Sequence, residues 1–233
     1  MNQNIIIAID GYSSTGKSTL AKMLSKYLNY KHINTGAMYR AVTLHAIRND
    51  WIDVASKKNH NKKMIIESIN FLKFDFIPDA NKVYQIYMNN EPVGSELKTP
   101  LVSEYVSTVS TYPIVREKIV HLQQEIGKSK GVVMEGRDIG SVVFPNAELK
   151  LFITASSEIR AKRRHCEFLK LGISSNFEDV LENLKMRDFL DSTRENSPLK
   201  QVKDAILIDN TDMSIDDQFN FAVDLVEKKI QFL

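Results

Sequence analysis

The sequence predicts an α/β fold in which helices flank a parallel sheet. Four short apolar runs, bounded by polar turns, have the composition of buried strands; they cover residues 5–9, 132–134, 149–153 and 205–208. Longer stretches with apolar residues at helical spacing occupy residues 18–28, 156–171, 177–189 and 215–230. Strands that alternate with helices are typical of a layered fold with a parallel sheet.

The composition is that of a globular chain long enough to bury a sizeable core. The 233 residues are 43% hydrophobic and 26% charged, and 31 Lys and Arg against 29 Asp and Glu give a net charge of +2. This balance and the dispersed Lys residues argue against a nucleic-acid partner. No apolar run approaches the roughly 18 residues of a membrane span. The single Cys166 excludes an intrachain disulfide. We therefore expect a cytoplasmic protein without nucleic-acid or membrane partners, and take it to be a monomer.

Residues 71–94 interrupt the alternation of strands and helices. Two aromatic-rich runs, at 71–77 and 83–88, predict antiparallel strands joined by a turn over Pro78-Asp79-Ala80-Asn81. This hairpin indicates a subdomain inserted into the α/β chain. The alternative is one antiparallel edge of the main sheet.

A phosphate-binding loop joins the first predicted strand to the first predicted helix. Residues 10–19 contain the pattern G-x-x-x-x-G-K-[ST], in which Gly11 and Gly16 allow backbone N–H groups to turn inward around a phosphate. Lys17 reaches the β- and γ-phosphates, and the Ser18 hydroxyl is a Mg²⁺ ligand in loops of this kind. The residues predicted to bind the nucleoside triphosphate are Gly11, Tyr12, Ser13, Ser14, Thr15, Gly16, Lys17, Ser18 and Thr19.

The loop alone leaves several classes of nucleotide-binding protein open. A GTPase would carry a guanine-reading N-K-x-D motif, and the Asn-Lys pairs at residues 61–62 and 81–82 lack the Asp. A motor ATPase would carry an apolar strand ending in Asp, whereas the strand at 132–134 runs into Glu135-Gly136-Arg137-Asp138. The short chain and its scattered Arg residues favour a kinase for a small phosphorylated or hydroxylated acceptor. A non-catalytic nucleotide-binding module remains the alternative from another class.

Arg residues lie at several positions where a small anion could bind. Arg137 directly follows a buried strand, at the edge where ligands bind in open parallel sheets. Its planar fork can hold two phosphate oxygens at once. Arg40 and Arg116 follow predicted helix starts, and Arg187 and Arg194 lie at helical spacing around an Asp. Each of these four, taken singly, has a surface ion pair as an alternative.

Taken together, these segments resemble the bacterial cytidylate kinases (CMP kinases), which belong to the P-loop nucleoside monophosphate kinases. The most specific part is the stretch G-R-D-I-G-S-V-V-F-P at residues 136–145, and the order and spacing hold over nearly the whole chain. The other matching segments are the loop at 10–19, Thr35-Gly36-Ala37-Met38-Tyr39-Arg40, residues 156–164, and Arg187-Asp188…Asp191…Arg194…Pro198-Leu199.

The resemblance implies a P-loop NTPase fold: a five-stranded parallel sheet flanked by helices, an inserted monophosphate-binding subdomain and a short lid. The single kinase domain, residues 1–233, would have its core at about 1–60 and 110–233, its insert at about 61–109 and its lid at about 160–195. The implied activity is ATP-dependent phosphorylation of CMP and dCMP to CDP and dCDP, with Mg²⁺. A kinase for another small acceptor, such as UMP, is the alternative.

The resemblance also implies roles for individual residues. The acceptor phosphate would be held by Arg40, Arg137 and Arg194. The ribose would contact Asp191 and Arg187, and Thr35 stands where the family often carries Ser. The side chains expected to act in phosphoryl transfer are Lys17, Arg137, Arg187 and Arg194.

Cytosine recognition is assigned in the same way to Ser107, Arg116 and Asp138. Ser107 is chosen for its offset of nine residues before Arg116, over Ser103 and Ser110 on the same predicted helix. The metal would lie near Ser18 and Glu135, and Glu135 stands where the family often carries the shorter Asp. A carboxylate such as Asp138 can accept from the exocyclic amine of cytosine, whereas uracil has a carbonyl there.

Overall fold

The computed structural model describes residues 4–54, 60–80 and 83–232, and the chain divides into two compact units. The first unit comprises residues 1–32 and 129–233, and the second comprises residues 33–128. The predicted insert, 61–109, falls inside the second unit, but compactness does not test the functional limits of core, insert and lid, which stay predictions. Within the described ranges, no helix is long and apolar enough to cross a membrane.

The first unit is built on the predicted five-stranded parallel sheet, which is confirmed. The strand order is β2-β6-β1-β7-β8, and β1 pairs in parallel with both β6 and β7, as β7 does with β8. The elements are β1 (Ile6–Gly11), α1 (Lys17–Leu28), β2 (Lys31–Asn34), which runs on into the second unit, β6 (Val132–Gly136), the π-helical turn η2 (Ile139–Val143), β7 (Leu149–Thr154), α6 (Ser157–Lys170), α7 (Phe177–Thr193), β8 (Ile206–Asp209) and α8 (Ile215–Gln231).

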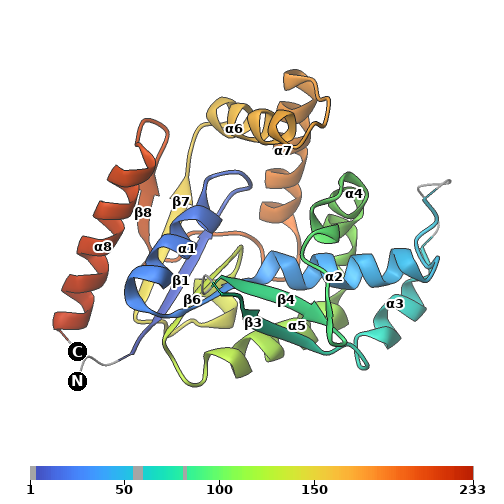
Figure 1. Ribbon diagram of the computed structural model, residues 1–233, viewed down its shortest axis with the longest axis horizontal. Helices are drawn as coiled ribbons and strands as arrows, with labels where there is room; N and C mark the ends of the chain where they lie inside the picture. The colour runs from blue at the N-terminus through green and yellow to red at the C-terminus, as the bar shows by residue number, and fades with distance from the viewer. Residues whose placement is uncertain (1–3, 55–59, 81–82, 233) are drawn as a thin grey trace. The chain divides into compact units, whose positions relative to one another are not determined.

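The core of this unit explains why β1 reads as an unbroken apolar run. Ile7 and Ile9 are fully buried in one hydrophobic cluster with Leu20 and Leu24 of α1 and Val226 of α8. Each such side chain contributes about 2 kcal/mol when it leaves water. Figure 1 shows α1 (blue) and α8 (red) beside the strands against which they pack.

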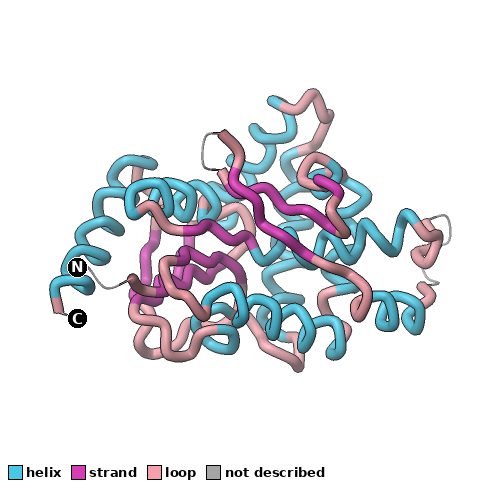
Figure 2. Tube along the Cα trace, turned by 60° about the horizontal axis from the view of Figure 1, so that its bottom comes forward, coloured by secondary structure: helices cyan, strands magenta, loops and turns pink. Residues whose placement is uncertain are grey.

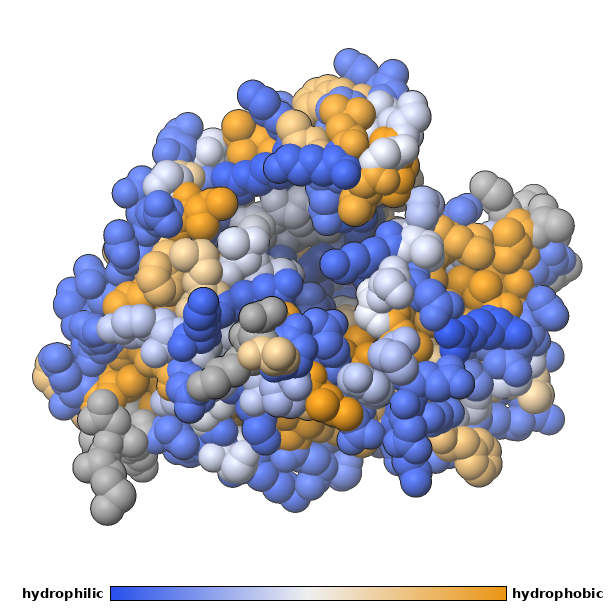
Figure 3. Space-filling view, viewed as in Figure 1, coloured by the Kyte–Doolittle hydropathy of each residue, from blue (hydrophilic) through white to orange (hydrophobic). Residues whose placement is uncertain are grey.

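Helices α6 and α7 form a hairpin with a small cluster of its own. Ala161 of α6 packs with Val180 and Leu184 of α7, apart from the main cluster. The hairpin also leaves apolar side chains in solvent, and hydrophobic residues are visible at the surface over α6 and α7 in Figure 3. The exposed apolar side chains of this hairpin include Leu169, Leu171, Met186, Phe189 and Leu190. This hairpin covers most of the predicted lid, whose movement stays a prediction.

The second unit contains the predicted hairpin, in a sheet of its own. Strands β3, β4 and β5 form a three-stranded antiparallel sheet, drawn in magenta in Figure 2. The hairpin is therefore confirmed and the alternative of an edge of the main sheet is wrong; Asn81 of the predicted turn lies outside the described residues. The elements are α2 (Thr35–Arg48), α3 (Lys62–Ser68), β3 (Phe74–Pro78), β4 (Tyr84–Met88), β5 (Glu91–Pro92), the 3-10 helix η1 (Glu96–Lys98), α4 (Pro100–Val109) and α5 (Pro113–Gly127).

Capping residues fix where the helices of the second unit begin, and buried apolar residues pack these helices together. The Asn34 side chain accepts a hydrogen bond from the Ala37 N–H and caps α2, so the helix start predicted before Arg40 is confirmed. Helix α4 begins with Thr99 as its cap and Pro100 at its first position. Met38, Val106 and Ile119 bring α2, α4 and α5 into one hydrophobic cluster. These contacts orient the predicted residues Arg40, Ser107 and Arg116 within this unit.

Candidate active site

The strands of the first unit end at one edge of its sheet. Because β1, β6, β7 and β8 run parallel, the segments that leave their carboxyl ends start from that same edge. They include the loop after β1, Arg137 after β6 and Asn210 after β8. The loop and Arg137 carry polar groups suited to a phosphate ligand.

The two glycines of the loop are required for different reasons. Gly16 caps α1 in the left-handed region, at φ 85°, and its carbonyl accepts from the N–H groups of Thr19 and Leu20. Gly11 has φ 145°, and a Cβ there would lie 2.0 Å from the Ile153 carbonyl oxygen. Gly11 therefore allows β1 and β7 to approach closely, a reason that the motif alone does not reveal.

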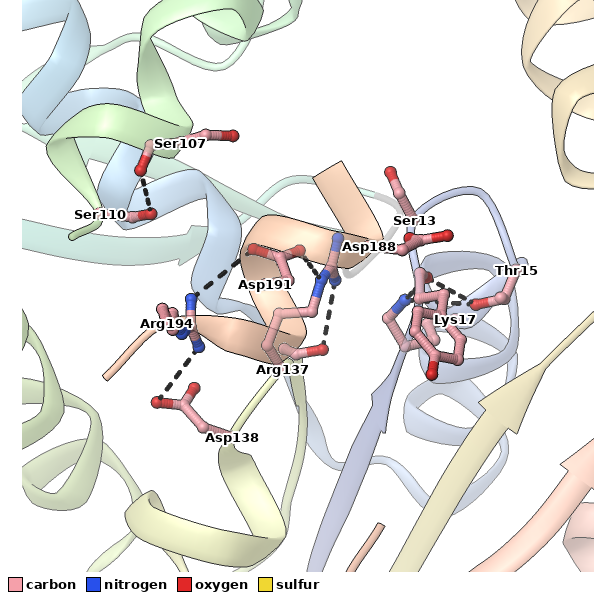
Figure 4. Close-up of polar contacts among 12 residues, drawn as sticks. Ser13, Thr15, Lys17, Ser107, Ser110, Arg137, Asp138, Asp188, Asp191 and Arg194 are labelled. Carbon is pink, nitrogen blue, oxygen red and sulfur yellow. Dashed lines mark hydrogen bonds and ion pairs between the residues drawn. The ribbon is translucent and has the colours of Figure 1, made fainter. Parts of the chain in front are cut away.

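Lys17 points into the loop, as Figure 4 shows. Its buried ammonium donates to the Tyr12 carbonyl and, at 3.2 Å, to the Thr15 hydroxyl. Burial, and next the charge of Arg137, hold the pKa of Lys17 well below its usual range. A polyanion bound beside this amine would favour the ammonium form and oppose that decrease.

A buried amide that sequence reasoning missed supports the loop from outside. Asn210 Nδ2 donates to the Thr15 carbonyl at 2.7 Å and to Gln218 Oε1 at 3.0 Å. The Arg163 fork in turn donates to Asn210 Oδ1 at 3.0 Å and to its carbonyl at 2.9 Å. Its position two residues after the strand predicted at 205–208 was the available signal for Asn210.

Arg160 links the loop to helix α7. The guanidinium lies 5.3 Å from the centre of the Tyr12 ring, which also packs edge-on against Phe152. Arg160 Nη1 donates to the Ser13 carbonyl at 3.4 Å and to Asp188 Oδ2 at 2.6 Å. Arg160 is therefore a buried structural contact of the loop; it lies in the family-like segment at 156–164, but the sequence assigned it no role.

The structure brings Arg137, Asp138, Asp191 and Arg194 together (Figure 4). Arg137 Nε donates to Asp191 Oδ2 at 2.8 Å, and Arg194 Nη1 lies 3.7 Å from the other oxygen of that carboxylate. Arg194 Nη2 is 3.9 Å from Asp138 Oδ2. A carboxylate between two guanidinium groups holds both in place, and guanidinium groups clustered in this way suit the binding of an anion.

The electrostatics of this cluster favour an anionic ligand. Burial opposes ionisation of Asp191, but the charge and hydrogen bond of Arg137, followed by Arg194, hold its pKa below the usual range. Burial and the Arg137 charge lower the pKa of Arg187 to about 10, so Arg187 is still a cation at neutral pH. Its buried Nε donates to no residue in the described part of the chain. An added phosphate would satisfy both the charge and the donor.

The oxygen donors near the loop suit Mg²⁺. Ser18 Oγ donates to Glu135 Oε2 at 2.7 Å, and His32 Nε2 lies 2.9 Å from Glu135 Oε1. Burial alone would raise the pKa of Glu135, but the His32 hydrogen bond and charge, with the Ser18 hydroxyl, hold that pKa below its usual range. Mg²⁺ is bound by few protein oxygens together with substrate phosphates, which fits this pair of donors.

Asp10 fixes the turn that carries Arg137 and Asp138. It is buried at the end of β1, where Oδ1 accepts from the Ile139 N–H at 2.8 Å and Oδ2 from the Gly140 N–H at 2.7 Å. Burial raises its pKa to about 6 in spite of these two hydrogen bonds. An Asp at the end of a buried strand was the sequence signal for this role.

Asp10 should make stability depend on pH. The folded protein binds this proton more tightly than the unfolded chain does, with a pKa of about 6 against 3.8. The contribution of Asp10 to the free energy of unfolding should therefore fall by about 2–3 kcal/mol as pH rises from about 4 to about 6. Asp10→Asn removes this dependence, so the stability difference between wild type and variant should shrink over that interval in urea unfolding. Exposed Asp75→Asn is the control, and a pH-independent difference for Asp10→Asn would contradict the assignment.

The second unit holds the other predicted acceptor residues. Arg40 Nη1 donates to Ser103 Oγ at 2.8 Å and to the Leu97 carbonyl at 3.1 Å. Arg116 is buried, donates to the Ser110 carbonyl at 3.1 Å and lies 5.3 Å from the centre of the Tyr39 ring. Ser103 and Ser110 thus contact the two Arg residues, and the choice of Ser107 among the three Ser residues stays a prediction, as does Thr35.

Comparison with known proteins identifies a family and full-length relatives. Residues 7–228 match the family model described as cytidylate kinase. A protein of Parabacteroides distasonis named cytidylate kinase is 47% identical over 228 residues, which cover 98% of this chain and 99% of that protein. Proteins of the same name from Flavobacterium psychrophilum and Fusobacterium nucleatum are 46% and 40% identical, covering 96% and 97% of this chain and 98% of each relative.

Proposed function

Because this chain belongs to the cytidylate kinase family, we propose that it transfers the γ-phosphoryl group of ATP to CMP and dCMP, forming CDP and dCDP. One structural observation supports the proposal independently of the family. The first unit contains both the phosphate loop around Lys17 and the cluster of Arg137, Asp191 and Arg194. A triphosphate loop together with a second anion site is what a kinase for a phosphorylated acceptor requires.

On the donor side, residues Gly11 to Thr19 bind the phosphates of ATP through loop N–H groups and the Lys17 ammonium. Ser18 and Glu135 would hold Mg²⁺ directly or through water, which fits their oxygen donors. Mg²⁺ held there would supply positive charge that offsets the negative charge of the phosphates during transfer. Asn210 and Arg160 keep the loop in shape through its Thr15 and Ser13 carbonyls.

On the acceptor side, Arg137 and Arg194 bind the phosphate of CMP together with Arg40. Asp138 accepts from the exocyclic amine of cytosine, and the base also contacts Ser107 and Arg116. Asp191 and Arg187 bind the ribose, and Thr35 is a further substrate-binding residue. These roles follow the sequence motifs; the ion pairs around Asp191 support them because they hold guanidinium groups ready for an anion.

Catalysis then rests on positioning and on neutralising charge. The acceptor oxygen is already a nucleophile at neutral pH, so no side chain has to act as a general base. Repulsion between two polyanions is the main obstacle, and Lys17, Arg137, Arg187 and Arg194 reduce it in a site shielded from bulk water. We also propose that the lid at about 160–195 closes over bound ATP and excludes water, which suppresses hydrolysis.

The test is a coupled assay with CMP, dCMP and UMP in wild type and in Asp138→Asn. Wild type should prefer CMP, because uracil would leave Asp138 facing a carbonyl. The variant should lower the ratio of kcat/KM for CMP over UMP by about 10-fold or more, since an amide can pair with either base. Asp75→Asn, exposed on β3, is the matched control.

The outcomes separate the candidate functions. Equal or better turnover of UMP by wild type would contradict cytosine specificity. Binding of ATP without phosphorylation of any nucleoside monophosphate would favour a non-catalytic nucleotide-binding module. An unchanged CMP-to-UMP ratio in Asp138→Asn would leave the kinase in place and remove Asp138 from base recognition.

Two further properties are proposed, the location of the protein and its oligomeric state. A cytoplasmic location fits the single, exposed Cys166, which suits a reducing compartment. We also propose that the protein is a monomer, because the roles assigned above require no residue from a second copy. Sedimentation equilibrium tests the second proposal, and the mass of one chain is the expected result.

A further inference from the structure

His32 is a buried polar residue that sequence reasoning left without a role. It lies on β2, which β6 separates from β1, and only 6% of its surface is exposed. Its Nε2 is 2.9 Å from Oε1 of Glu135, which is itself 4% exposed. An ionised carboxylate can only accept hydrogen bonds, so Nε2 carries the proton of this contact.

The same carboxylate reaches the phosphate loop with its other oxygen. Glu135 Oε2 accepts from Ser18 Oγ at 2.7 Å. His32, Glu135 and Ser18 thus form a chain of hydrogen bonds that joins β2, the end of β6 and the second residue of α1. The chain ends on the hydroxyl proposed to bind Mg²⁺.

We propose that His32 is a positioning residue for metal-dependent ATP binding: it holds the Glu135 carboxylate so that Ser18 presents its oxygen lone pairs to Mg²⁺. The inference rests on the proposed metal role of Ser18 and Glu135. It assigns no contact between His32 and the nucleotide.

The two hydrogen bonds of the Glu135 carboxylate explain how His32 would affect Ser18. A Glu side chain has three rotatable bonds, and fixing them costs conformational entropy. The bond to Ser18 holds one carboxylate oxygen, and the bond to His32 on the other oxygen helps to fix the plane of the carboxylate. Because the Ser18 hydroxyl donates its single proton to Glu135, the orientation of the carboxylate also decides where the lone pairs of Ser18 point. Outer partners of metal ligands act in this way at other sites.

The experiment measures the affinity of a non-hydrolysable ATP analogue by calorimetry, once with EDTA and once with Mg²⁺, without an acceptor. The readout is the gain in affinity that Mg²⁺ produces. His32→Ala should reduce this gain about 10-fold, while binding in EDTA stays at the wild-type level. His32→Gln, whose amide can donate to Glu135, should recover most of the gain. His121→Ala, at an exposed position, is the control, and thermal unfolding follows the fold of each variant.

Two results would overturn the role of His32. One is a wild-type gain in His32→Ala, and the other is an equal loss of affinity with and without Mg²⁺, which a purely structural role predicts. Ser18→Ala separates the inference from the metal site on which it rests. If Ser18→Ala removes the gain and His32→Ala does not, the metal site stands and only the role of His32 fails. If Ser18→Ala keeps the gain, the metal site fails and the inference fails with it.

Discussion

Arg137→Lys should lower kcat/KM for CMP by about 10²–10³-fold without unfolding the protein. Arg137 uses Nε for Asp191, at 2.8 Å, and Nη1 for the Gly136 carbonyl, at 3.3 Å, and its fork still offers N–H groups to a phosphate. A Lys ammonium has one nitrogen and cannot hold Asp191 and two phosphate oxygens in one plane. Steady-state kinetics with CMP varied at saturating ATP measure the loss.

The matched control for this change is Arg48→Lys. Arg48 also pairs with carboxylates, Glu91 at 3.2 Å and Glu96 at 2.7 Å, but these contacts are exposed. Exposed pairs of this kind contribute little, so Arg48→Lys should leave kcat/KM unchanged. Near-normal kcat/KM in Arg137→Lys would refute the role of Arg137. A loss of activity accompanied by a large fall in melting temperature would show that its role is structural.

Gly11→Ala should destabilise the protein by about 3 kcal/mol or more. The new Cβ would meet the Ile153 carbonyl oxygen at 2.0 Å, on a backbone with φ 145°. Neither atom can move aside without separating β1 from β7 in the centre of the sheet. Urea unfolding followed by circular dichroism measures the change, and ATP binding should weaken with it because the loop begins at this residue.

Gly172→Ala distinguishes the two causes of that loss. Gly172 also has a positive φ, 71°, but nothing lies within 4 Å of a Cβ built there. It should therefore cost only the backbone strain, about 1–2 kcal/mol. Equal losses in the two variants would show that the contact with Ile153 does not matter.

The regular elements were predictable wherever burial left a pattern in the sequence. Strand β1 and helix α8 were predicted almost to their ends, because buried strands are continuously apolar and packed helices repeat every 3.6 residues. Strands β2 and β5 were missed. The residues of β2, Lys-His-Ile-Asn, and of β5, Glu-Pro, contain no apolar run, and both strands lie at sheet edges.

The candidate site likewise has features that the sequence predicts and features that it does not. The loop around Lys17 was predictable because its residues are contiguous, and Arg137 because it follows a buried strand directly. The pairing of Arg137 with Asp191 was not, since the two are 54 residues apart and their ion pair leaves no trace in either local pattern. Which of Ser103, Ser107 and Ser110 contacts the base is undecided by sequence for the same reason.

The sequence by itself determined the kind of sheet, the phosphate loop and the family. Only the tertiary structure revealed the partners that support the loop and the Arg cluster: Asp10 with Gly140, His32 with Glu135, and Thr15 with Asn210, which are 130, 103 and 195 residues apart. Such pairs depend on the strand order β2-β6-β1-β7-β8, which places β6 between β2 and β1. The periodicity of apolar residues shows that an element is buried, but it does not show which other element lies beside it. Contacts between residues distant in the sequence are therefore decided by tertiary packing.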